Sequence, residues 1–127
     1  MREDGHGMEY RARVYERYAS AIKGSARQFN AVVAERWAAA FRRYLRGWLP
    51  QDCNVRIADL ACGDGRLLHL LRSAGYTAVV GVDISPEQTA LARQVHDNVA
   101  QADVLEFLRD REGQFDVIFG LDILEHL

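Results

Sequence analysis

One ten-residue stretch, IADLACGDGR at residues 57–66, constrains the fold more than any other part of the chain. A short apolar run passes through Asp59 into a loop of small residues, where glycine lets backbone approach a ligand closely. Leucines then recur at helical spacing over residues 67–71. A buried strand, a tight glycine loop and a helix N-terminus together predict a nucleotide-type pocket at the carboxyl end of a parallel sheet.

The remaining sequence predicts an α/β architecture around this stretch. An apolar run at residues 78–82, a weaker one at 98–102 and a third at 115–119 are typical of strands in a covered parallel sheet. Helical patterns separate these runs, so we expect a Rossmann-like, doubly wound parallel sheet. The strand order typical of that fold is 3-2-1-4, and we expect it here. We divide the chain into an N-terminal helical cap at residues 1–50 and an incomplete core at residues 51–127.

Two helices are expected before the first strand, a short one at residues 8–20 and a long one at residues 27–48. Apolar side chains recur along the long helix at three- and four-residue steps. They are Phe29, Val33, Trp37, Phe41, Tyr44 or Leu45, and Trp48. We expect this aromatic stripe to pack on the sheet and the arginines beside it to form a solvated face. His69, in the helix after the glycine loop, is expected to be exposed.

Aspartates gather where the proposed strands end. Asp83 closes the second strand, and Ser85, Pro86 and Gln88 follow with the features of a helix start: a cap, a first-turn proline and a capping box. A carboxylate held between a strand end and a rigid helix start can accept both hydroxyls of a ribose. That geometry serves more than one nucleotide cofactor, so Asp83 alone does not identify the ligand.

Two motifs resemble those of class I S-adenosylmethionine-dependent methyltransferases. The run Asp59-Leu60-Ala61-Cys62-Gly63-Asp64-Gly65 resembles the family's motif I, with Ala61 in place of its first glycine. The run from Phe115 to Leu127, with Asp-Ile-Leu-Glu-His at residues 122–126, is similar to the family's fourth motif. Together with Val82-Asp83-Ile84, the resemblance covers about residues 55–127.

This resemblance implies methyl transfer from S-adenosyl-L-methionine, and it assigns a set of cofactor-binding residues. They are Asp59, Ala61, Cys62, Gly63, Gly65, Asp83, Ile84, Asp103, Val104 and Leu121. In the family the acid at the position of Asp103 contacts the adenine amino group. Helix capping is the alternative role for Asp103, and the two roles are compatible.

The charge pattern favours this cofactor over a dinucleotide. Five aspartates fall at or just past the ends of the proposed strands: Asp59, Asp64, Asp83, Asp103 and Asp122. An acidic rim repels a pyrophosphate and attracts a sulfonium cation. The dinucleotide glycine spacing also fails, because its third glycine would fall on Arg66 or Leu68.

The resemblance leaves the acceptor and the catalytic base open. We expect a small-molecule acceptor, such as a metabolite, quinone or sugar, because the chain lacks the Asn-Pro-Pro-Tyr-type run of amino-methylating DNA enzymes. His126 is the candidate general base. Asp122, Glu125 and His126 resemble a run in quinone-biosynthesis O-methyltransferases for which a divalent cation has been proposed. Adjacent residues point apart on a helix, so we predict no metal site.

Two other functions remain possible at this stage: an NAD(P)-dependent oxidoreductase, and a non-catalytic module that binds S-adenosylmethionine. No apolar run reaches the roughly 18 residues that span a bilayer, and two cysteines make no disulfide framework, so we expect a cytoplasmic protein. The family fold has three further strands after the fourth. We therefore expect the N-terminal part of a larger enzyme, inactive by itself, with an apolar edge on its fourth strand.

Overall fold

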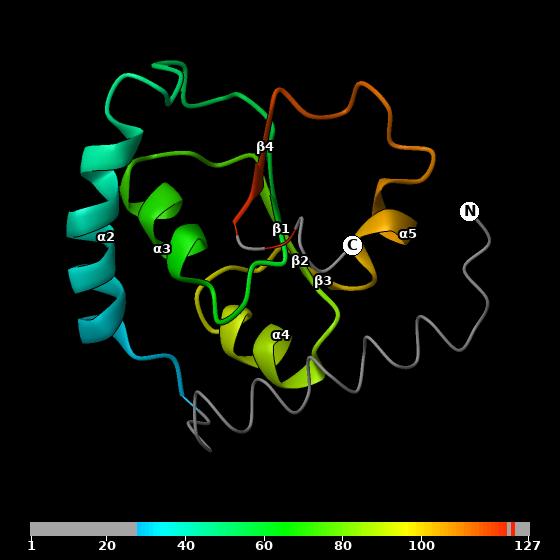
Figure 1. The fold of residues 1–127 in the computed structure, drawn as a ribbon, viewed down its shortest axis with the longest axis horizontal. Coiled ribbons are helices and arrows are strands. Elements are labelled where there is room, and N and C mark those ends of the chain that lie inside the picture. The colour runs from blue at the N-terminus through cyan, green and yellow to red at the C-terminus, as the bar shows by residue number, and fades with distance from the viewer. Residues whose placement is uncertain (1–27, 122, 124–127) are drawn as a thin grey trace.

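A computed structural model describes residues 28–121 and Ile123 of the chain (Figure 1). Helices and strands alternate along the chain after the first helix. The elements are α2 (Ala31–Leu45), β1 (Ile57–Leu60), α3 (Arg66–Ser73), β2 (Val79–Asp83), α4 (Pro86–Ala92), β3 (Val99–Gln101), α5 (Val104–Leu108) and β4 (Val117–Gly120). The helix expected at residues 8–20 lies outside the described residues.

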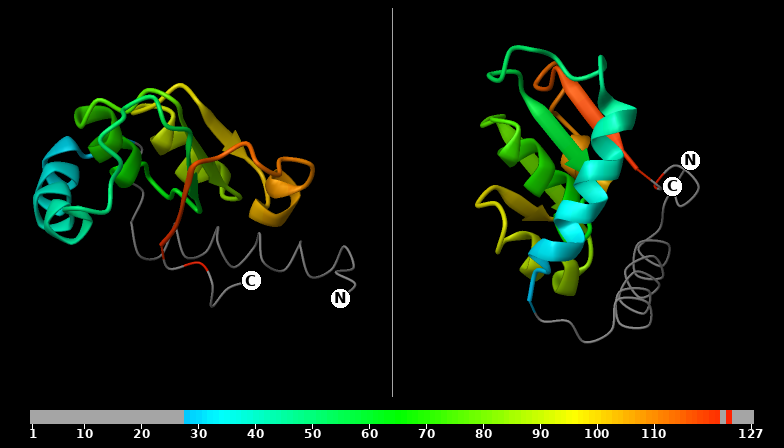
Figure 2. Two further views of the ribbon diagram at one scale, coloured as in Figure 1. Left: turned by 90° about the horizontal axis from the view of Figure 1, so that it is seen from above. Right: turned by 90° about the vertical axis from the view of Figure 1, so that its left-hand side faces the viewer.

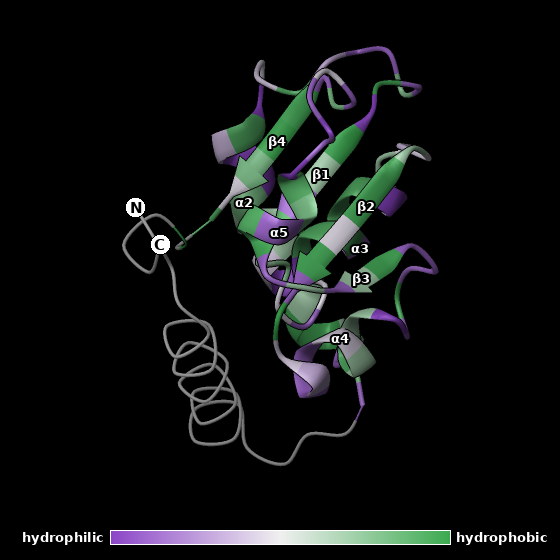
Figure 3. Cartoon of the chain, turned by 90° about the vertical axis from the view of Figure 1, so that its right-hand side faces the viewer, coloured by the Kyte–Doolittle hydropathy of each residue, from purple (hydrophilic) through white to green (hydrophobic). Residues whose placement is uncertain are grey.

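The four strands form one parallel sheet in the order β3-β2-β1-β4. This confirms the predicted Rossmann-like architecture. Every residue of β1 and β2 is buried, as expected of central strands covered on both faces. In this register Asp59 of β1 lies between Gly81 of β2 and Phe119 of β4. Figure 3 shows the same pattern as hydrophobic strands with hydrophilic connections at their ends.

Helices cover both faces of the sheet (Figure 2). On one face the leucines of α3 pack with Ile57, Val79 and Val95. On the other face Val104 and Phe107 of α5 pack with Ala58 and Leu60 of β1 and with Val80 and Val82 of β2. β1 supplies alternate residues to the two clusters, because successive side chains of a strand point to opposite faces.

Helix α2 is shorter than expected and packs differently. It begins after Asn30, whose side-chain oxygen accepts a hydrogen bond from the Val33 N–H at 3.1 Å. Its buried residues are Ala34 and Ala38, and the helix packs mainly against α3. The predicted stripe packs only in part: Phe29, Trp37, Phe41 and Leu45 lie against the core, whereas Tyr44 and Trp48 are exposed. The domain boundary at residue 50 stays a prediction.

The expectation that His69 is exposed was also wrong. Its Nε2 lies 2.5 Å from Oε1 of Glu35 on α2, and its ring lies 5.6 Å from that of Phe29. The Phe29 N–H also donates to Oε1 of Gln94 at 2.8 Å, just beyond α4. These contacts join α2 and the residues before it to α3 and to the end of α4.

At the other edge of the sheet, β4 pairs only with β1 among the described strands. Ile118 on this strand is 52% exposed, which agrees with the apolar edge expected from the sequence. Within the described residues, no helix is both long enough and apolar enough to span a bilayer.

Candidate functional site

The loop after β1 turns sharply enough to use left-handed backbone at three of its five residues. Ala61, Gly63 and Gly65 have φ angles of 57°, 59° and 97°. Glycine adopts such angles without strain, whereas an L-residue such as Ala61 pays about 1–2 kcal/mol. The Cys62 N–H bonds to the Val82 carbonyl at 2.9 Å, and so continues the β1–β2 pairing into the loop.

The glycines around this loop allow close packing inside the protein. A Cβ on Gly65 would lie 3.1 Å from Cα of Ala92, so a side chain there would push α3 and its loop away from α4. A Cβ on Gly81 would lie 2.7 Å from Leu68 Cδ1 and 3.0 Å from Cys62 Sγ. Gly81 was not identified from the sequence, because only the tertiary contact reveals its role.

Cys62 points into the hydrophobic core. Burial raises the pKa of its thiol far above the ordinary range, and the carboxylates of Asp59, Asp83 and Asp64 add to the effect. The thiol therefore stays protonated and lies buried in the core.

Asp83 connects the loop to the start of α4. One carboxylate oxygen, Oδ2, accepts a hydrogen bond from the Gly63 N–H at 2.9 Å. The other, Oδ1, accepts one from the Ser85 N–H at 2.9 Å. Asp83 thereby fixes the glycine loop and the helix start relative to each other, and a nearby ligand would meet a preorganised edge.

The predicted capping box at α4 forms only in part. Ser85 Oγ accepts from the Gln88 N–H at 3.3 Å, as expected of a cap. The reciprocal bond would use the Ser85 N–H, which donates to Asp83 instead. Gln88 Oε1 is left buried without a hydrogen-bond partner among the described residues. Sequence reasoning treated Gln88 only as a capping residue and missed this polar atom beside the site.

Asp59 is the most deeply buried of the candidate acids, with 2% of its surface exposed. Its Oδ2 has no hydrogen-bond partner among the described residues. Burial, with a smaller contribution from the charge of Asp83, raises the pKa of Asp59 to about 8. Asp59 is therefore mainly protonated at neutral pH and adds little negative charge to the rim.

Two further aspartates of the rim have partners among the described residues. Asp64 Oδ2 forms an ion pair with Arg66 Nε at 3.1 Å. Asp103 caps α5, because its Oδ1 accepts from the Leu105 N–H at 2.9 Å and the Glu106 N–H at 3.3 Å. Since Asp59 is mainly protonated and Asp64 is paired with Arg66, the rim is less anionic than a count of aspartates suggests.

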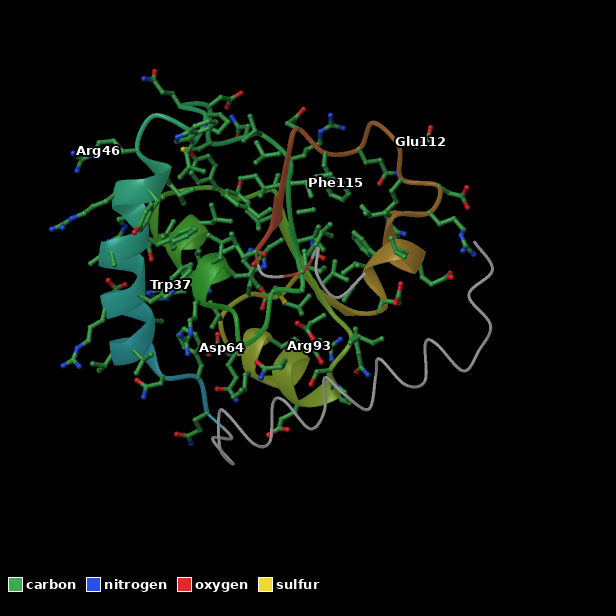
Figure 4. All side chains as sticks on the ribbon, in the orientation of Figure 1. Trp37, Arg46, Asp64, Arg93, Glu112 and Phe115 are labelled. Carbon is green, nitrogen blue, oxygen red and sulfur yellow. The ribbon has the colours of Figure 1, made fainter. Side chains whose placement is uncertain are left out.

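The structure brings most of the predicted cofactor-binding residues to one edge of the sheet. The Ala102 N–H donates to the Asp83 carbonyl at 2.9 Å, which holds the end of β3 beside the end of β2. Ile84 and the buried Val104 follow β2 and β3, respectively. Leu121 follows β4 and packs against the α3 side of the core. Figure 4 shows Asp64 and Arg93 at this end of the molecule.

The candidate base and the possible metal ligands cannot be placed. Asp122, Glu125 and His126 lie outside the described residues. Within residues 28–121 and at Ile123, no group of three or more His, Cys, Asp or Glu side chains is arranged to hold a metal ion.

The chain matches a family model described as "Methyltransferase domain" over residues 57–127. It is 36% identical over 74 residues to a cyclopropane-fatty-acyl-phospholipid synthase of Escherichia coli, a match that covers 58% of this chain and 19% of that protein. It is 31% identical over 102 residues to a ubiquinone biosynthesis O-methyltransferase of a Chelativorans species, covering 76% of this chain and 40% of that protein. The chain thus spans less than half the length of these curated relatives.

Solved structures show the same fold. A methyltransferase from Archaeoglobus fulgidus, described as SAM-dependent, superimposes with a TM-score of 0.64 at 26% identity, covering 89% of this chain and 46% of that one. The magnesium protoporphyrin IX methyltransferase of Synechocystis, solved with bound SAM, gives a TM-score of 0.60 at 21% identity, covering 92% of this chain and 64% of that one.

Proposed function

Because the chain belongs to the class I family of S-adenosylmethionine-dependent methyltransferase domains, we propose that the carboxyl edge of its sheet binds S-adenosyl-L-methionine. We further propose that the whole protein transfers the methyl group to a small-molecule acceptor. The family match agrees with the motifs at residues 59–65 and 115–127. It decides against the NAD(P)-dependent oxidoreductase that the sequence alone left open.

The observation that carries this proposal is the position of Asp83. Its carboxylate joins the Gly63 N–H to the Ser85 N–H at the end of β2. A carboxylate offers about four acceptor positions on its two oxygens, so one such group can accept from several donors at once. Asp83 can therefore fix the loop and also receive ribose hydroxyls. Because the loop is already ordered, binding needs little rearrangement.

The remaining residues are proposed to surround the other parts of the cofactor. Backbone of Ala61, Cys62 and Gly63 would lie along the methionine portion, which Gly65 permits by drawing the loop against α4. Asp59 lies behind this backbone. The Asp103 and Val104 backbone at the start of α5 would contact adenine, while Ile84 and Leu121 supply apolar contact.

When bound, the cofactor supplies an electrophilic methyl group on a sulfonium. This chain's residues then act by holding it in one orientation and by excluding water from the edge of the sheet. His126 stays our candidate for the base that accepts a proton from an oxygen nucleophile. Residues 1–50 are proposed to act as a cap beside the site. The two free cysteines, Cys53 and Cys62, support a cytoplasmic location.

The test is calorimetric titration of the chain with S-adenosylhomocysteine, with NAD titrated in parallel. We expect saturable binding of S-adenosylhomocysteine only. Asp83→Asn should weaken it at least tenfold, because the amide cannot accept from both backbone groups as the carboxylate does. Asp52→Asn is the matched control: Asp52 also accepts a backbone N–H, that of Asn54 at 2.9 Å, but in an exposed turn before β1.

Failure of the folded chain to bind S-adenosylhomocysteine would overturn the proposal for this chain. An equal loss in the Asp83→Asn and Asp52→Asn variants would remove Asp83 from the site. Binding without methyl transfer by a full-length protein, across metabolite, quinone and sugar acceptors, would instead support the non-catalytic module.

A further inference from the structure

The arginines of the described residues fall into two groups. Six of them have polar partners: Arg56, Arg66 and Arg109 pair with carboxylates, and Arg72, Arg93 and Arg111 donate to backbone carbonyls. The others lie on α2 and in the turn after it. Among the described residues, Arg36, Arg43 and Arg46 have neither a hydrogen bond nor an ion pair.

Neutralising charge is scarce in this part of the chain. Residues 31–50 contain four arginines and one acid, Glu35, which gives a net charge of +3. Glu35 is engaged by His69 of α3, and the charge of Arg42 also acts on it. The positive charge of Arg36, Arg43 and Arg46 is therefore left facing solvent, on a chain whose net charge is −2.

Exposed apolar side chains lie on and beside this side of α2, with Val32 on it and Tyr44 about a quarter-turn away. At about 100° per residue, Val32, Arg36 and Arg43 point roughly opposite to the buried Ala34 and Ala38. Tyr44 is 76% exposed and Val32 is 63% exposed. In the right-hand view of Figure 2, α2 lies in front of the other elements.

The turn after α2 adds an exposed arginine and an exposed tryptophan at the end of the helix. Trp48, at 83%, is the most exposed large hydrophobic residue described. Figure 4 shows Arg46 reaching outward at the end of α2, whereas Trp37 lies toward α3. We define the basic face as Arg36, Arg43, Arg46, Val32, Tyr44 and Trp48.

We propose that the basic face docks this protein on the surface of a membrane containing anionic phospholipids. Guanidinium groups pair with lipid phosphates, and amphipathic Trp and Tyr rings partition to the level of the headgroups. Exposed Val, Tyr and Trp side chains beside the arginines can therefore contact the headgroup region while the guanidinium groups pair with lipid phosphates. The proposal does not depend on the bound cofactor or on the methyl acceptor.

A nucleic acid is the other anionic partner that a basic face could hold. Besides arginine, proteins contact nucleic acids through Ser, Thr, Asn, Gln and Tyr. Of these five residue types, residues 31–50 contain only one residue, Tyr44. The exposed residues beside these arginines are valine, tyrosine and tryptophan. A valine side chain packs more favourably against lipid hydrocarbon than against a nucleic acid base. The composition therefore favours a lipid surface.

The test uses Trp48 as a reporter. The chain has two tryptophans, so Trp37→Phe leaves Trp48 as the single fluorophore. Vesicles of phosphatidylcholine with about one-third phosphatidylglycerol should shift its emission to shorter wavelength and sediment the protein. Vesicles of phosphatidylcholine alone should do neither. Raising the salt toward 1 M should weaken binding, because the Debye length falls to about 3 Å.

Charge-reversed variants then locate the surface. One arginine near an anionic membrane contributes about 1 kcal/mol, which is about fivefold in affinity, so Arg43→Glu should weaken vesicle binding at least tenfold. Arg109→Glu is the matched control, since it makes the same change of charge at an exposed residue of the α5 side. The affinity of the Arg109→Glu variant for vesicles should differ from that of the parent protein by less than threefold.

Three results would overturn the proposal. One is the absence of any emission shift or sedimentation with phosphatidylglycerol vesicles. Another is an equal loss of vesicle binding in the Arg43→Glu and Arg109→Glu variants, which would show that overall charge, and not the basic face, attracts the protein to the vesicle. The last is tighter binding to a short DNA duplex or single-stranded RNA than to the vesicles, with Trp48 emission quenched and not shifted.

Discussion

Replacing Asp59 by asparagine should make this protein more stable at neutral pH. Asp59 is 2% exposed in the middle of the sheet, and its Oδ2 has no hydrogen-bond partner among the described residues. An ionised carboxylate there loses its hydration and lies near the charge of Asp83. Asparagine has nearly the same shape as the protonated acid and cannot ionise. The substitution therefore removes the cost of the charge with little change in packing.

The size of the effect follows from the two protonation equilibria. Asp59 has a pKa of about 8 in the folded protein, raised from about 4 in the unfolded chain. The folded state therefore binds the proton more tightly. Stability from this group is complete below about pH 4, falls by about 1.4 kcal/mol per pH unit above it, and is lost once the pH passes about 8. At pH 7 the loss is on the order of 4 kcal/mol.

The assay is denaturant unfolding of the ligand-free chain and the Asp59→Asn variant from pH 4 to pH 9. The two proteins should have equal unfolding free energies near pH 4. Their difference should then grow to about 4 kcal/mol at pH 7 and level off above pH 8. Glu112→Gln, a change of one carboxylate at an exposed residue, should give no such growing difference. A difference for Asp59→Asn that is constant across this range would refute the reasoning.

The other predictions concern the glycine loop and a helix cap. Ala61→Gly should raise the unfolding free energy by about 1 kcal/mol, because Ala61 has a φ of 57°; a lower melting temperature would contradict this. Gly65→Ala should lower the unfolding free energy by at least about 3 kcal/mol, since the alanine would have a φ of 97° and a Cβ 3.1 Å from Ala92 Cα. Gly113→Ala is the control: its φ is 72° but its Cβ would meet open space, so it should cost about 1 kcal/mol. Asp103→Ala should cost about 1 kcal/mol by loss of the cap, measured by thermal unfolding, with Asp103→Asn close to the parent.

Local signals were sufficient to predict the sheet and its site-bearing edge. Apolar runs without alternation predicted covered parallel strands, and the observed order β3-β2-β1-β4 is the one expected of the Rossmann-like fold that the glycine loop and the motifs indicated. Ser85 and Asp103 cap helices as their sequence contexts indicated. These features depend on a few neighbouring residues, so the sequence displays them directly.

Helix α2 shows what periodicity leaves undecided. The pattern identified a helix, but not that Ala34 and Ala38 would be its buried residues. The small side chains of Ala34 and Ala38 let α2 approach α3 closely. With that side of the helix buried, Tyr44 and the arginines of α2 are exposed to solvent. Which side of a helix faces the core depends on the shape of the partner, and that partner is distant in the sequence.

At the site, the sequence by itself determined which residue types meet at the edge of the sheet, and the tertiary structure decided their chemical states. Asp59 and Asp83 both read as strand-end acids. Folding buries Asp59 without a hydrogen bond to Oδ2 and raises its pKa, while Asp83 receives two backbone donors. The Ser85 bond to Asp83 is local, but the Gly63 bond to Asp83 joins residues 20 positions apart, and the burial of Asp59 likewise comes from tertiary packing. The Gly63 bond and the burial exist only once the chain has folded, so the residue pattern alone could not show them.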